Sequence, residues 1–217
     1  MSRDWLSAYV HFQGSLYGGT TDRVILDVVE PFVRICQRRE WISSFFFIRY
    51  SENGPHVRVR LQGGEDVLRD TVKPELETHV QDVLPVDLHP KDREGDLDDP
   101  VRWVPYERET NRYGGPRGVK LAERFFHCSS EAAFQLLEGC RGQGHAARLG
   151  KGLLAMVVLL HAFFDTQEQA VRLLEQYGTG YLSNIARDEE QQNRLQEAFE
   201  EGYDRQDDTL AAYVNAT

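Results

Sequence analysis

The order of strand-like and helix-like segments in the first half of the 217-residue chain constrains the fold most strongly. Residues 5–13 are rich in aromatic and β-branched side chains and are followed by a glycine, which predicts a strand. Residues 24–35 have apolar side chains at helical spacing, with Thr21 or Asp22 as the candidate cap and Pro31 as a candidate kink. The chain is therefore expected to open with a strand and a helix.

The next segments predict a hairpin, a second helix and a last strand. Residues 45–50 (FFFIRY) and 57–61 (VRVRL) are strand-like and flank the turn sequence ENGP. Residues 65–83 predict a helix with an internal proline, Pro74, and residues 101–108 predict a fourth strand. Residues 85–100 hold three prolines and six acids without periodicity and predict a loop. The order β-α-β-β-α-β is that of the ferredoxin-like split unit.

The sequence after Gly115 changes to helical patterns. The predicted helices are residues 119–126, 130–137, 145–164, 168–177 and 188–213. We therefore expect an α+β fold in a single domain, with a ferredoxin-like antiparallel sheet in residues 1–115 and a helical part in residues 116–217 packed on or beside it.

Composition excludes several classes of protein. The net charge of −10 argues against nucleic acid as the main partner, because phosphate binding requires clustered Lys and Arg. The longest apolar run, residues 153–160, is far shorter than the roughly 20 residues that span a bilayer. The first residues lack a signal-peptide pattern, and Cys36, Cys128 and Cys140 lack metal-ligand or disulfide-framework spacing. We expect a cytoplasmic protein without a structural metal.

The strand sequence HVRVR is the first candidate site. Because side chains alternate along a strand, His56, Arg58 and Arg60 share one face. Arginine does not release its proton at neutral pH, so its role would be to hold an anion or a developing negative charge. The alternative is a solvated outer face whose charges protect an edge strand.

Two further candidates are less specific. In YERETNRYGG, Glu109 and Arg112 form a candidate ion pair, and Tyr113 and Gly114 precede a second glycine suited to positive φ. The alternative is an ordinary strand-to-helix turn. His161 lies in the most apolar predicted helix, where it is either a core residue or a base.

The segments FFFIRY…GPHVRVR, YERETNRYGG and LAERFFHCSSEAAFQLL, in this order, resemble the C-terminal, elimination-type domain of lantibiotic dehydratases and the stand-alone thiopeptide-type bacteriocin biosynthesis proteins. The resemblance covers residues 5–137. It implies a precursor-peptide substrate and gives Arg58, Arg60 and Arg112 catalytic, electrostatic roles. The candidate substrate-binding residues in these motifs are Arg49, Tyr50, Glu109, Tyr113 and Gly114.

The resemblance leaves three activities open. A lyase would eliminate glutamate from glutamylated Ser or Thr of a ribosomally made peptide, giving dehydroamino acids. A pyridine-forming macrocyclase would join two dehydroalanines by aza-cycloaddition and expel the leader peptide. A non-catalytic subunit would present the precursor to a dehydratase. Neither chemistry needs a metal or an organic cofactor.

The sequence departs from the family at two places. Elimination enzymes of the family have an acid/base histidine in an HMxxNR-like segment near the C-terminus, but here no histidine follows His161. His56 and His161 are therefore the candidate replacements, unless a partner chain supplies the group or it is missing. Ser129 replaces an acid in FHCSS. The expected partners are the precursor with its leader and a glutamyl-transferring dehydratase subunit, and a homodimer remains open.

Overall fold

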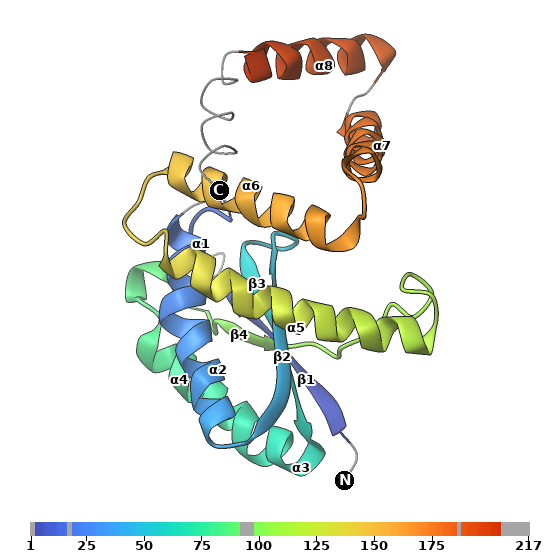
Figure 1. Ribbon diagram of the computed structural model, residues 1–217. Helices are drawn as coiled ribbons and strands as arrows, with labels where there is room; N and C mark the ends of the chain where they lie inside the picture. Colours follow the sequence, from blue (N-terminus) through green and yellow to red (C-terminus); the bar gives the residue numbers. More distant parts are fainter. Residues whose placement is uncertain (1–2, 17–18, 92–97, 186–187, 205–217) are drawn as a thin grey trace. The chain divides into compact units, whose positions relative to one another are not determined.

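The computed structural model describes residues 3–16, 19–91, 98–185 and 188–204 (Figure 1). The chain forms two compact units, Met1–Gly142 and Gln143–Thr217. The first unit contains the sheet and the helices that pack on it, and the second is helical.

The first unit is built on a four-stranded antiparallel sheet. Its strands are β1 (Arg3–His11), β2 (Ile42–Tyr50), β3 (His56–Gly64) and β4 (Val101–Trp103), in the spatial order β2-β3-β1-β4. The α+β class and the predicted β-α-β-β-α-β order are confirmed. The fourth strand is shorter than predicted, because Pro105 has no N–H with which to extend the ladder.

Two composite helices make the crossovers. The first runs through α1 (Gly19–Arg23), the π-helical η1 (Val24–Val29) and α2 (Glu30–Arg38). The second runs through α3 (Glu65–Val67), the π-helical η2 (Leu68–Val72) and α4 (Lys73–Val83), and the short 3₁₀ turn η3 (Val86–Leu88) follows.

Each π segment ends next to a proline. Glu30 N–H bonds the Ile25 carbonyl and Lys73 N–H bonds the Leu68 carbonyl, in each case across five residues. Pro31 and Pro74 follow immediately and lack the N–H that an α-helical bond would use. The predicted proline kink is thus a local widening of the helix.

The predicted helix cap is wrong. α1 begins at Gly19, before both Thr21 and Asp22. The Thr21 hydroxyl is buried and lies 2.9 Å from the carbonyl oxygens of Ser15 and Leu16, so it fixes the preceding loop instead.

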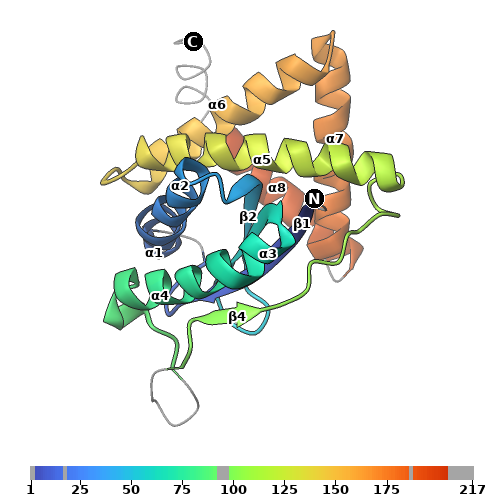
Figure 2. The same ribbon diagram turned by 90° about the horizontal axis from the view of Figure 1, so that it is seen from below.

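The hydrophobic core lies between one face of the sheet and the composite helices, with α2 and α4 side by side against it (Figure 1, Figure 2). Alternate residues of β1 and β3 point into this core. Its fully buried members from the two strands are Ala8, Val10, Val57, Val59 and Leu61. The opposite sheet face is therefore left for other side chains.

Helix α5 (Pro116–Glu138) belongs to the first unit and covers the outer edge of β2. The predicted helices 119–126 and 130–137 join into this one helix, since nothing between them breaks it. Phe47 N–H donates to Ser130 Oγ at 3.1 Å, and His127 Nδ1 lies 3.0 Å from the Phe45 carbonyl oxygen. Side chains of α5 thus satisfy backbone groups that a further strand would otherwise pair.

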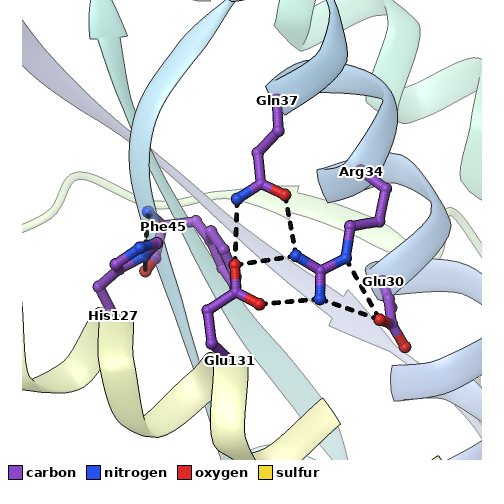
Figure 3. A network of polar contacts seen from close by, with 6 residues as sticks. All are labelled: Glu30, Arg34, Gln37, Phe45, His127 and Glu131. Atoms are coloured by element: carbon purple, nitrogen blue, oxygen red, sulfur yellow. Dashed lines mark hydrogen bonds and ion pairs between the residues drawn. The ribbon is translucent and has the colours of Figure 1, made fainter. Parts of the chain in front are cut away.

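A polar network ties α5 to α2 (Figure 3). Arg34 donates to Glu131 at 2.8 Å and to Glu30 at 3.1 Å, and Gln37 donates to Glu131 at 3.1 Å. Burial opposes ionisation of Glu131, but the hydrogen bonds from Arg34 and Gln37 outweigh it and lower the pKa of Glu131. The network therefore holds α5 against α2.

The second unit consists, within its described residues, of α6 (His145–Phe163), α7 (Gln167–Ile185) and α8 (Glu189–Asp204). The predicted helices 145–164 and 168–177 are confirmed, and α7 extends further. The part of the prediction 188–213 beyond Asp204 lies outside the described residues. Across the described ranges, no helix is long and apolar enough to cross a membrane.

Replacing Ser130 by Ala should lower the free energy of unfolding by about 1–3 kcal/mol, because the Phe47 N–H would remain without its side-chain acceptor. Urea unfolding measures the loss. Ser129→Ala, at an exposed neighbouring position, is the matched control and should change stability by less than about 0.5 kcal/mol. Equal effects of the two variants would contradict the edge-covering role of Ser130.

Candidate functional site

The candidate site is the sheet face opposite the core, here called the polar face. Strand register brings its residues into cross-strand pairs: His11 with His56, Tyr9 with Arg58, and Ser7 with Arg60. Paired residues of neighbouring strands share a face, with Cβ atoms about 5 Å apart. The polar face comprises Trp5, Ser7, Tyr9, His11, Phe46, Ile48, Tyr50, His56, Arg58, Arg60 and Arg102.

Arg58 is held between two tyrosine rings. Its guanidinium carbon lies 3.4 Å from the Tyr50 ring centroid and 4.6 Å from that of Tyr9. Its Nε donates to His56 Nε2 at 3.2 Å. Cation–π contacts on both sides and this hydrogen bond fix the orientation of the guanidinium.

His56 is a neutral partner of Arg58. Its Nδ1 lies 2.9 Å from the Gly54 carbonyl oxygen and therefore carries the proton, which leaves Nε2 to accept from Arg58. Burial, with a contribution from Arg58, lowers the pKa of His56, while the Gly54 hydrogen bond opposes this. Because both nitrogens are engaged and the residue is 1% exposed, His56 is placed to position Arg58.

Arg60 is buried among aromatic rings. Its guanidinium lies 4.9 Å from the Tyr106 ring centroid, 5.7 Å from that of Phe46 and 5.9 Å from that of Tyr9. The residue is 7% exposed, so this end of the strand is not a solvated outer face. Burial lowers the pKa of Arg60, but an arginine remains charged at neutral pH.

Several buried donors of the polar face lack hydrogen-bond acceptors. Within the described structure, Nε and Nη1 of Arg60, the Ser7 hydroxyl and the Trp5 indole N–H have no partner. Ser7 is the cross-strand neighbour of Arg60, and Trp5 lies two residues away on the same face. Buried donors without acceptors are costly, so this arrangement is suited to an anion.

The segment between β4 and α5 covers one end of the polar face. Tyr106 contacts the rings of Trp5 and Phe46 at centroid distances of 5.5 and 5.8 Å. Arg108 donates to the buried Glu123 of α5 at 2.7 and 3.3 Å. Burial, with a contribution from Glu123, raises the pKa of Tyr106 to about 12, so its hydroxyl remains a donor.

A cavity of about 440 Å³ opens at the other end of the polar face, where β1 ends. His11 lines it, together with Arg102 of β4, and is 8% exposed. Burial is the main cause that lowers the pKa of His11 to about 4; His56 and Arg102 add to the effect and Asp98 opposes it. His11 is therefore neutral at physiological pH.

The remaining predicted residues are dispersed. Tyr50 lies on the polar face, whereas the Arg49 side chain pairs with Asp22 of α1 at 2.8 Å. Glu109 and Arg112 form the expected ion pair at 3.0 Å, but both are exposed. In the described part of the chain, Arg112 contacts neither Arg58 nor Arg60.

Tyr113 and Gly114 belong to the loop that precedes α5. The Tyr113 ring contacts Phe126 of α5 at 5.6 Å. Gly114 and Gly115 adopt φ of 72° and 94°, which confirms the predicted use of the glycine pair. His161 belongs to α6 in the second unit, where it lines a cavity of about 320 Å³ between α6 and α7.

Sequence reasoning missed the contribution of β1. Trp5, Ser7, Tyr9 and His11 alternate with core residues in WLSAYVH, and this alternation was the available signal. Tyr106 was missed because only strand register and the loop path place it over Arg60. Among the residues that the structure describes, no three His, Cys, Asp or Glu side chains form a candidate metal site.

The fold and the polar face define a class: an α+β protein whose split βαββαβ sheet holds a buried arginine, Arg60, and a partly exposed one, Arg58, on the face opposite the core. The chain belongs to the family described as lantibiotic biosynthesis dehydratase C-term, whose model matches residues 5–217. Among curated proteins, no sequence matches the chain significantly.

Three solved structures are similar to this chain. TsrL is 21% identical with a TM-score of 0.66, and the match covers 99% of this chain and 59% of TsrL. The pyridine synthase TbtD from thiomuracin biosynthesis is 21% identical with a TM-score of 0.68, covering 96% and 72% of the two chains. The tRNA dependent lantibiotic dehydratase MibB from Microbispora sp. 107891 is 28% identical with a TM-score of 0.52, covering 64% of this chain and 12% of MibB.

The free energy of unfolding should decrease as the pH falls below neutrality, because the folded protein opposes protonation of His11. A histidine with an ordinary pKa near 6.5 when unfolded and about 4 when folded takes up its proton more readily in the unfolded state. The contribution of His11 to the free energy of unfolding is complete above about pH 6.5. As the pH falls to 4, up to about 3 kcal/mol of this free energy is lost. Urea unfolding of wild type and His11→Gln at several pH values tests this. A stability difference between the two proteins that stays constant with pH would contradict it.

Arg60→Met should raise the free energy of unfolding by about 1–3 kcal/mol in the absence of ligand, because it replaces buried unpaired donors with an apolar chain. Arg58→Met, two residues along the same strand, is the matched comparison and should lower it, since Arg58 has a hydrogen bond to His56 and an ion pair with Glu52 to lose. Thermal unfolding of wild type and both variants measures these changes. Destabilisation by Arg60→Met would show that the Arg60 donors have partners.

Proposed function

We propose that this protein eliminates glutamate from glutamylated Ser or Thr residues of a ribosomally made precursor peptide, leaving dehydroamino acids. The observation that carries the proposal is the buried guanidinium of Arg60, whose Nε and Nη1 lack acceptors beside the equally unpartnered Ser7 hydroxyl. Elimination produces two anionic groups, an enolate and a departing carboxylate, which such donors stabilise.

Arg58 and Arg60 have separate roles in stabilising these two anions. Arg58 is held by Tyr9 and Tyr50 and has side-chain exposure of 18%, so a peptide reaches it more readily than it reaches Arg60. Two cations on one strand face, one at the surface and one buried, fit a substrate that carries both a reacting carbonyl and a carboxylate leaving group. Donors fixed before the reaction stabilise the developing charge without reorganising.

The proposal implies partners. Family membership supports a leader-bearing precursor peptide as substrate and a glutamyl-transferring dehydratase subunit as the source of the ester. The match covers 12% of MibB, and the proposal assigns the glutamylation step to a partner dehydratase subunit. The chemistry is that of a cytoplasmic lyase without a cofactor, and it involves no nucleic acid directly.

The test is mass spectrometry of the precursor peptide from the same gene cluster, coexpressed with its glutamyl-transferring partner. Glutamate adducts, about 129 Da each by residue mass, should give way to losses of about 18 Da only when this protein is present, as the eliminated ester requires. Arg60→Met and Arg58→Met should leave the adducts in place. Wild-type removal of adducts together with an active Arg60→Met variant would refute the assigned site.

Disappearance of the adducts without this protein would refute elimination. A dehydroalanine-containing peptide then separates the alternatives. A pyridine macrocycle with released leader would identify a cyclase, and unchanged peptide that nevertheless binds would identify a precursor-presenting subunit.

A further inference from the structure

The proposed elimination requires a group that removes the α-proton, and the inference that follows rests on that proposed function. His56 is 1% exposed, and its two nitrogens are engaged by the Gly54 carbonyl and by Arg58. His161 belongs to the second unit. His56 thus has no free nitrogen with which to accept a proton from a substrate on the polar face.

His11 has the properties that His56 lacks. It is the last residue of β1 and the cross-strand partner of His56, and the two ring centroids are 4.6 Å apart. The imidazole makes no hydrogen bond within the described residues. It also lines the 440 Å³ cavity, so a nitrogen lone pair is available to a molecule that enters there.

We propose that His11 is the proton acceptor of the elimination and that the glutamylated residue binds where the cavity meets the polar face, with its reacting carbonyl toward Arg58. A neutral ring nitrogen takes the α-hydrogen, and the electrons of the C–H bond form the enolate. The enolate collapses to the Cα=Cβ double bond as the Cβ–O bond breaks, and glutamate leaves as its carboxylate. The imidazolium then returns its proton to water.

The surroundings of His11 support this role. Arg102 also lines the cavity, where it forms an ion pair with Asp98 at 3.2 Å, and Arg58 lies beyond His56 on the same sheet face. The buried environment keeps His11 unprotonated at neutral pH, as its lowered pKa indicates. The titratable groups that face His11 or share its cavity are Tyr9, His56, Lys91, Asp98, Asp99 and Arg102.

The experiment measures glutamate release from the isolated glutamylated precursor by wild type, His11→Gln and His11→Asn. Loss of a general base should reduce the rate about 100-fold or more. His79→Gln is the matched control, because His79 lies on α4 at the opposite face of the sheet and bonds the Val28 carbonyl. Its rate should stay within about twofold of wild type.

The pH dependence of kcat/KM separates proton transfer from a structural role. Wild type should show an acidic limb that reports the unprotonated base, and this limb should be missing from the residual activity of the His11 variants. Circular dichroism identifies the folded variants. Should neither variant fold, a wild-type limb near pH 4 supports the role of His11, and a rate independent of pH between 3.5 and 6 opposes it.

Two failures are distinguishable. If wild type releases no glutamate, the proposed function fails, whatever the variants do. If wild type is active and a folded His11 variant retains its rate, or retains the same acidic limb, the assignment of His11 is overturned while the elimination function stands.

Discussion

The antiparallel pairing of β1 with β3 is the constraint on which the rest of the first unit depends. Its register sets Tyr9 against Arg58 and Ser7 against Arg60, and it sends the alternate residues Ala8 and Val59 into the core. A slip of β3 by one residue would exchange its two faces. His56, Arg58 and Arg60 would then be buried under the helices. Core formation and site assembly are thus specified by the same set of backbone hydrogen bonds.

The fold was largely accessible from the sequence because its signals are local. Strand alternation, the ENGP turn and helical periodicity gave the order of elements that the structure confirms. The misjudged features depend on context. The end of β4 is decided by Pro105, and the single helix α5 is recognised only by its packing along β2.

Only part of the site could be predicted from the sequence. HVRVR placed His56, Arg58 and Arg60 on one face, as the register of β3 shows. Sequence alone does not give the register of β1 against β3, so the contribution of β1 was hidden in an ordinary alternating pattern. The resemblance to the family selected Arg112 as a third site residue, but its surface ion pair with Glu109 is set by the loop path.

The unsatisfied Nε and Nη1 donors of Arg60 have a consequence for the evolution of such a chain. Buried donors without acceptors destabilise a fold, and a protein selected only for stability would tend to lose them. Selection for a reaction, in contrast, maintains a residue that selection for stability would discard. At this one position, selection for a reaction and selection for stability therefore favour different residues.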